Sequence, residues 1–137
     1  MTERNEANPK IEKLLVERWS PRSFDGSDIP DADLDVIFEA GGWAPSAYNA
    51  QPWTFLYAKR GDANWDRFLS LLVEFNQSWA KDASVLVFVV SDTMMRNPKG
   101  DSPNHSHSFD AGAAWVQMAL QATAMGYHAH GMSGIEF

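Results

Sequence analysis

Apolar residues recur at helical spacing in two segments near the start of the chain. The first predicted helix follows the start signal Asn8-Pro9, and its apolar positions repeat at i, i+3, i+4 and i+7 as far as Arg18. The second predicted helix opens near Pro30 and stops at Gly41-Gly42. Its inner stripe consists of Leu34, Ile37, Phe38 and Gly41. Between the two helices, Ser20 precedes a proline, which disfavours helical geometry, so the chain is expected to turn there.

Two later segments have the composition of β-strands. WTFLYA, residues 53–58, is rich in aromatic and extended-chain residues. SVLVFVVSD, residues 84–92, is a continuous apolar run of the kind expected for a central strand covered on both faces. Between them, a single helix is predicted after Asp62, with one face formed by Trp65, Phe68, Leu69, Leu72, Asn76 and Trp79. A buried carboxamide needs hydrogen-bond partners, so Asn76 is either a binding residue or is satisfied by neighbouring backbone.

The last third of the chain changes from polar to apolar. Residues 93–108 contain two prolines and a glycine and predict a long loop. Nearly every position from Phe109 to Met125 is apolar, which predicts a helix buried on most sides. A strip of small residues, Gly112, Ala119 and Ala122, would let another helix approach closely, for example one from a two-fold partner. Because the chain has no internal repeat and no linker, residues 1–137 are predicted to form one domain.

Composition narrows the class of protein. The chain is 45% hydrophobic and 21% charged, which is typical of a globular protein. Its longest apolar run is too short to span a bilayer, its start lacks the apolar core of a signal peptide, and it contains no cysteine, so a cytoplasmic protein is expected. A net charge of −7 argues against a nucleic-acid surface. An anionic ligand would therefore need local basic groups.

Several common catalytic motifs are absent from the sequence. It contains no GxxxxGK[ST] or GxGxxG loop, no HExxH, no GxSxG and no cysteine nucleophile, so the usual signals of phosphoryl transfer, dinucleotide-binding folds and common hydrolases are missing. HSH at 105–107 and HAH at 128–130 could place histidines on one face of a strand. A histidine metal-binding domain is therefore one alternative, although no carboxylate lies at a helpful spacing.

Four motifs follow one another in order: RWSPRSF (18–24), APSAYNAQPW (44–53), NQSWAKDAS (76–84) and GYHAHGMSGIEF (126–137). Together, over nearly the whole chain, they resemble the nitroreductase family of FMN-dependent oxidoreductases. The resemblance implies an α+β fold, with a central mixed or antiparallel sheet flanked by helices, and an obligate homodimer that holds FMN between its subunits. The family pattern normally continues past Phe137 for several tens of residues, so the resemblance implies a C-terminally shortened, nitroreductase-like domain.

The resemblance also implies which residues bind FMN. The grip on the phosphate and ribityl chain matches Arg18, Trp19, Ser20 and Arg22. A guanidinium suits this task because its planar fork makes paired hydrogen bonds to phosphate oxygens. The loop that reaches the flavin of the other subunit matches Pro45, Ser46, Ala47 and Asn49, with a weaker contribution from Gln51. Asn76 matches the amide that reads the polar edge of the isoalloxazine. Met132, Ser133 and Gly134 match the segment near flavin N5, where backbone N–H groups can stabilise the reduced ring.

Without the resemblance, the two arginines would fit a solvated surface pair, and residues 132–134 would fit an ordinary glycine-containing turn.

The implied mechanism has two steps. NAD(P)H passes a hydride to the flavin and leaves, and a small acceptor such as a nitroaromatic, quinone or enone then collects the electrons. No side chain is expected to act as an acid or base, and residues 93–108 are a candidate for shaping the acceptor pocket. Trp79 stands where many relatives carry a basic residue, so weakened flavin affinity is a hypothesis. The alternatives are a catalytically degenerate flavin-binding scaffold, a truncated fragment and the histidine metal-binding domain.

Overall fold

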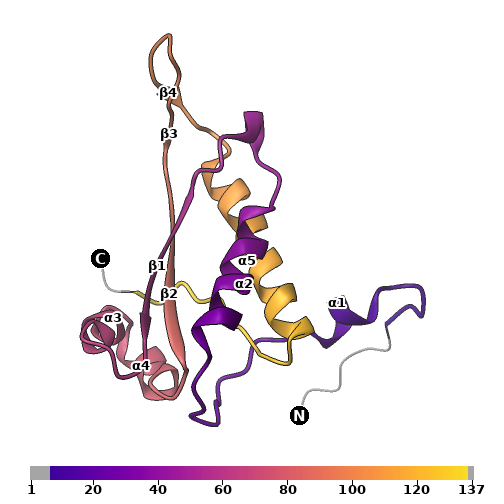
Figure 1. The fold of residues 1–137 in the computed structure, drawn as a ribbon, viewed down its shortest axis with the longest axis vertical. Coiled ribbons are helices and arrows are strands. Elements are labelled where there is room, and N and C mark those ends of the chain that lie inside the picture. The colour runs from indigo at the N-terminus through magenta and orange to yellow at the C-terminus, as the bar shows by residue number, and fades with distance from the viewer. Residues whose placement is uncertain (1–6, 136–137) are drawn as a thin grey trace.

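The computed structural model describes residues 7–135, which form helices around an antiparallel strand pair (Figure 1). In chain order, the elements are α1 (Lys13–Glu17), α2 (Asp31–Gly42), the 3₁₀ turn η1 (Ala47–Asn49), β1 (Trp53–Lys59), α3 (Trp65–Ser70), α4 (Glu74–Ala80), β2 (Val85–Ser91), β3 (Met94–Met95), β4 (Ser102–Pro103) and α5 (His107–Ala124). The expectation of an α+β fold is confirmed.

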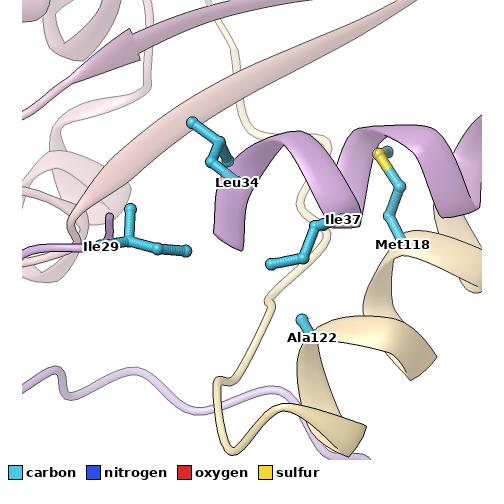
Figure 2. Packing of buried hydrophobic residues seen from close by; sticks show 5 residues of the cluster. All are labelled: Ile29, Leu34, Ile37, Met118 and Ala122. Carbon is cyan, nitrogen blue, oxygen red and sulfur yellow. The ribbon is translucent and has the colours of Figure 1, made fainter. Parts of the chain in front are cut away.

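Helices α2 and α5 lie side by side and bury the first core cluster between them and the sheet (Figure 2). This cluster consists of Ile29, Leu34, Ile37, Met118 and Ala122. The predicted stripe of α2 is thus confirmed, and α2 begins directly after Pro30, as expected. Gly41 allows the close approach of α5, because a Cβ at this position would lie 2.7 Å from Met118 Cγ. The first helix is shorter than its apolar spacing suggested, since only Lys13–Glu17 is helical.

The strands β1 and β2 pair antiparallel along their whole length, from Trp53 opposite Ser91 to Lys59 opposite Val85. Both strand predictions are confirmed, and β2 packs against a core cluster on each face, but the expectation that it is a central strand is wrong. Within residues 7–135, β2 pairs only with β1, and Val90 remains exposed. A largely apolar cavity of about 940 Å³ lies against residues 85–89 of β2. Its other walls are the inner faces of α2 and α5 and parts of residues 126–135.

The segment after Asp62 forms two short helices, α3 and α4, instead of the single helix predicted. The break has a clear cause, because the backbone between the helices pairs with the end of the chain. Leu72 forms an isolated β-bridge with Ile135, and the N–H of Val73 donates to the carbonyl oxygen of Gly134 at 3.1 Å. The predicted inner face is nevertheless buried before and after the break, since Trp65, Leu72 and Asn76 are all buried.

Residues 93–108 form the long loop that their composition suggested, with two paired strands of two residues each inside it. Strands β3 and β4 form a hairpin that extends beyond the end of β2, and α5 begins at His107 (Figure 1). Arg96 stabilises the hairpin through ion pairs with Asp92 and Asp101. The N–H of Asn104 donates to the carbonyl oxygen of Thr93 at 2.8 Å and closes its base.

Helix α5 matches the predicted helix within two residues at each end, but it is buried on one side only. Phe109 is 81% exposed and Val116 is also exposed. The predicted small-residue strip is divided, since Ala119 and Ala122 are buried in the interior, whereas a Cβ at Gly112 would meet nothing within 4 Å. Over residues 7–135, no helix has both the length and the apolarity needed to cross a membrane.

Candidate functional site

The arginine-bearing turn, residues 18–22, lies against the segment that follows α5. His130 Nδ1 is 2.8 Å from the carbonyl oxygen of Pro21, so the imidazole donates a hydrogen bond to the turn. The Trp19 ring meets the ring of His128 edge-on, with 5.9 Å between centroids. These two contacts join segments that are more than a hundred residues apart in the sequence, and they fix the turn beside residues 128–130.

Both guanidinium groups of this turn remain free of carboxylates. Arg18 Nη1 donates to Ser20 Oγ at 3.4 Å, and the guanidinium of Arg22 lies over the exposed ring of Phe75, 5.9 Å from its centroid. Neither arginine forms an ion pair with any residue that the structure describes. In a chain of net charge −7, this turn therefore offers two cationic groups to an anion.

Asn76 and Gly134 are in direct contact. Asn76 Nδ2 donates to the carbonyl oxygen of Gly134 at 3.2 Å, and the asparagine is buried. A Cβ at Gly134 would lie 2.4 Å from Asn76 Nδ2, so any larger residue at this position would force the amide to shift. In residues 7–135, Asn76 Oδ1 has no hydrogen-bond partner, and it remains available as an acceptor. Since Phe75 precedes Asn76 in α4, the Arg22 guanidinium also lies against this helix.

Three further predicted residues, Trp19, Met132 and Ser133, line the apolar cavity along β2. The Arg22, Asn76 and Gly134 positions are not part of that lining. The charged and amide groups thus lie apart from the cavity, and we place the polar chemistry of the site with them. Trp79, on the cavity wall, stacks on Phe24 with 6.4 Å between ring centroids, and its Nε1 is buried without a partner among the described residues.

Two ionisable groups near the turn have shifted pKa values. Donation from the hydroxyl and backbone N–H of Ser27 to its carboxylate lowers the pKa of Asp25. The pKa of Tyr127 is raised, mainly because its phenol donates a hydrogen bond to the carboxylate of Asp33. This bond ties the segment after α5 to the first turn of α2.

The second group of predicted residues, Pro45, Ser46, Ala47, Asn49 and Gln51, lies at the opposite end of α5 (Figure 1). The N–H of Ala47 donates to Asp110 Oδ2 at 3.0 Å in the first turn of α5, whereas the arginine-bearing turn contacts residues that follow its last turn. Eighteen helical residues at 1.5 Å each separate these ends by about 25 Å. Within one chain, the structure therefore does not bring the two groups of predicted residues together.

The backbone of the loop 45–51 is strained. Tyr48, Asn49 and Gln51 have φ angles of 53°, 55° and 47°, in the left-handed region that costs a non-glycine residue roughly 1–2 kcal/mol. Ser46 Oγ accepts a hydrogen bond from the N–H of Gln51 at 2.9 Å, and Tyr48 is 93% exposed. The loop thus presents an aromatic side chain and small polar groups outward.

Sequence reasoning did not identify Asp110 as a functional residue. The carboxylate is 4% exposed and holds the loop 45–51 through Ala47. A signal was present, because Asp110 is the only charged residue between Phe109 and Met125. A single acid in an otherwise apolar helix needs a buried hydrogen-bond donor.

The histidines do not form a metal site. His107 Nδ1 is 2.7 Å from Ser91 Oγ, and His130 Nδ1 bonds to the backbone of Pro21. In the part of the chain that the structure describes, no three residues among histidine, cysteine, aspartate and glutamate could hold a metal ion together. His107 and His130 therefore have local structural partners.

Comparison with known proteins gives a consistent result. The model of the nitroreductase family matches residues 15–75. The crystal structure of an oxidoreductase containing FMN is 50% identical in sequence, with a TM-score of 0.92 over 98% of this chain and 70% of that chain. The CLA biosynthesis enone reductase of Lactiplantibacillus plantarum is 24% identical over 168 residues, covering 98% of this chain and 77% of that protein. The oxygen-insensitive NADPH nitroreductase of Helicobacter pylori is 34% identical over 83 residues, which is 60% of this chain and 39% of that protein.

Proposed function

We infer that this chain belongs to the nitroreductase family, whose members are NAD(P)H-dependent flavin oxidoreductases, and we propose that it binds FMN and reduces a small acceptor with electrons from NAD(P)H. Bound FMN would supply the hydride and electron transfer chemistry, and the protein would supply binding and orientation. The observation that carries the proposal is that three groups cluster together. They are the guanidinium of Arg22, which forms no ion pair within residues 7–135, the buried amide of Asn76, and the backbone of Gly134, which carries no side chain.

Each predicted cofactor residue has a chemical task in this proposal. Arg18 and Arg22 would hold the phosphate, because each guanidinium can donate paired hydrogen bonds and neither is neutralised by a carboxylate in residues 7–135. Asn76 would turn its free Oδ1 toward a donor on the isoalloxazine edge. Ser133 and Gly134 would offer backbone N–H groups, and the absence of a side chain at Gly134 leaves room for the Asn76 amide.

The working unit in this proposal is a homodimer. The loop 45–51 is about 25 Å from the arginine-bearing turn of its own chain, and a second copy can supply it to the same flavin. The outer face of α2 and α5 offers an interface, since a groove of about 540 Å³ there is lined by Leu14, Val36, Trp43 and Leu120, among others. Trp43 is 77% exposed, and large exposed apolar side chains of this kind mark contact surfaces.

The acceptor in this proposal is a nitroaromatic, a quinone or an enone. The resemblance to the enone reductase supports the last class, and the Helicobacter pylori relative supports the first. The hairpin of β3 and β4 leads directly into the start of α5, where the loop 45–51 is attached, so we assign it to the acceptor side.

The first test is an FMN titration of the purified chain, followed by its visible spectrum. We expect a yellow complex with wild-type protein and a clear loss of affinity in Arg22→Ala. Arg67→Ala is the matched control, because it removes the same charge from an exposed position on α3. Equal FMN affinity in Arg22→Ala and Arg67→Ala would contradict the assigned phosphate contact.

The second test is NAD(P)H oxidation in the presence of a nitroaromatic, a quinone and an enone. Acceptor-dependent oxidation by the FMN complex is expected. FMN binding without oxidation of either nicotinamide would instead identify a degenerate flavin-binding scaffold.

A further inference from the structure

Asp110 carries a buried carboxyl group whose position is not explained by apolar packing. It is 4% exposed in the first turn of α5, and it forms no ion pair within residues 7–135. Its Oδ2 instead accepts hydrogen bonds from the N–H of Ala47 at 3.0 Å and from Ser106 Oγ at 3.2 Å. A buried carboxylate is tolerated only where such donors are fixed in place, so Asp110 and Ala47 hold each other.

The donor Ser106 is itself held by a second buried residue. Asn104 Oδ1 accepts a hydrogen bond from the backbone N–H of Ser106 at 3.2 Å and lies 3.0 Å from Ser106 Oγ, whose one hydrogen is shared between Asn104 and Asp110. Asn104 is joined in turn to the base of the β3–β4 hairpin through Thr93. A polar network thus runs from the base of the hairpin through Asn104, Ser106 and the Asp110 carboxylate to the N–H of Ala47.

Apart from the Ala47–Asp110 bond, the hydrogen bonds that the structure describes for the loop 45–51 all lie within the loop, such as that from the N–H of Gln51 to Ser46 Oγ. Tyr48, Asn49 and Gln51 adopt left-handed backbone conformations, and no residue of η1 is buried. A strained and exposed loop keeps its conformation only where the surrounding structure imposes it. The Ala47–Asp110 hydrogen bond joins positions 63 residues apart and connects the loop to α5.

We propose that Asp110 is a positioning residue, which holds the loop 45–51 in the conformation that reaches the flavin bound by the other copy of the chain. This inference rests on the proposed function. Because Asp110 is buried, it would act on the flavin through the N–H of Ala47.

The first experiment compares FMN affinity in three variants. Asp110→Ala removes the acceptor for Ala47 and should weaken FMN binding about tenfold, as expected for a lost charge-assisted hydrogen bond. Asp110→Asn keeps an oxygen that can accept from Ala47, so its affinity should stay within about threefold of wild type. Met118→Ala is the control, because it removes a buried side chain from the same helix, away from the loop. It should lower the unfolding temperature and leave FMN affinity unchanged.

FMN affinity that is lost in Asp110→Ala and kept in Asp110→Asn would distinguish a positioning role from a general loss of structure. FMN affinity in Asp110→Ala equal to that of wild type would overturn the inference. So would a loss of affinity in Met118→Ala as large as that in Asp110→Ala at the same loss of thermal stability. Failure of the wild-type chain to bind FMN would refute the proposed function itself, which is a separate and visible outcome.

The second experiment tests whether Asp110 acts across the dimer. Asp110→Ala and Arg22→Ala chains, carrying different affinity tags, are co-expressed and the mixed dimer is isolated. One of its two sites combines both defects, whereas the other joins an intact loop to an intact arginine-bearing turn. We expect one FMN of wild-type affinity per mixed dimer. A mixed dimer without a wild-type site would place the effect of Asp110 within its own chain and overturn the inference.

Discussion

Replacement of Gly134 by alanine tests the contact on which the candidate site depends. A Cβ at this position would lie 2.4 Å from Asn76 Nδ2 and 2.9 Å from Val73 Cγ2. The backbone of Gly134 is not in the left-handed region, so any effect comes from crowding rather than from φ. To clear the new methyl group, the Asn76 side chain must rotate away from the carbonyl oxygen that it now binds.

The expected cost is the sum of three contributions. Crowding against Val73 should cost about 1–3 kcal/mol, and the lost hydrogen bond of Asn76 about 1 kcal/mol. Alanine also reduces the conformational freedom of the unfolded chain, which offsets about 0.4–1 kcal/mol of this cost. We therefore expect Gly134→Ala to lower the free energy of unfolding by about 1–4 kcal/mol.

The assay is urea unfolding followed by tryptophan fluorescence, with Gly112→Ala as the matched control. A Cβ at Gly112 would meet nothing within 4 Å in an exposed part of α5, so this variant should gain about 0.5–1 kcal/mol. The same substitution thus has opposite signs at the two sites. A Gly134→Ala chain as stable as the Gly112→Ala chain would refute the crowding argument. FMN titration of both variants then reports whether Asn76 has moved.

Three further predictions concern the segment after α5. Gly131→Ala should destabilise the chain by about 1–3 kcal/mol, measured by thermal unfolding, because its Cβ would lie 2.8 Å from the rigid ring of Trp115. Gly126 has a φ of 87°, so Gly126→Ala should cost about 1–2 kcal/mol in the same assay, and an unchanged midpoint would contradict this reading. Asp33→Asn should return the pKa of Tyr127 toward 10.0, as followed by ultraviolet titration of the phenol. Since the folded-state pKa is raised, the stabilisation from this bond is present below pH 10.0 and is lost as pH rises through the raised value, and the variant should lack that loss.

The local sequence pattern predicted a helix or strand well where the structure of that segment depends on its own residues. The strands at 53–58 and 84–92, the helix from Pro30 and the long helix after residue 108 all follow from periodicity and end signals. The failure between residues 62 and 80 has a clear physical cause, because the structure there depends on a distant partner. The break between α3 and α4 exists because Val73 bonds to Gly134, and no pattern near residue 73 contains that information.

In the candidate site, too, the sequence predicted which residues take part but not the contacts between distant segments. The order of the motifs suggested which residues bind the cofactor, and the structure brings Arg22, Asn76 and Gly134 into one region. The separation of the loop 45–51 from that region depends on the length and packing of α5, which local motifs do not encode. Asp110 was not predicted because its hydrogen-bond partner, the N–H of Ala47, lies 63 positions earlier in the sequence.

The open side of β2 has a practical consequence for work with this chain. Its backbone donors and acceptors have no partner strand within residues 7–135, and an unpaired strand of apolar residues is a template on which other extended chains can assemble. Refolding from urea at high protein concentration should therefore compete with precipitation, and dilute samples should give the more reversible transitions.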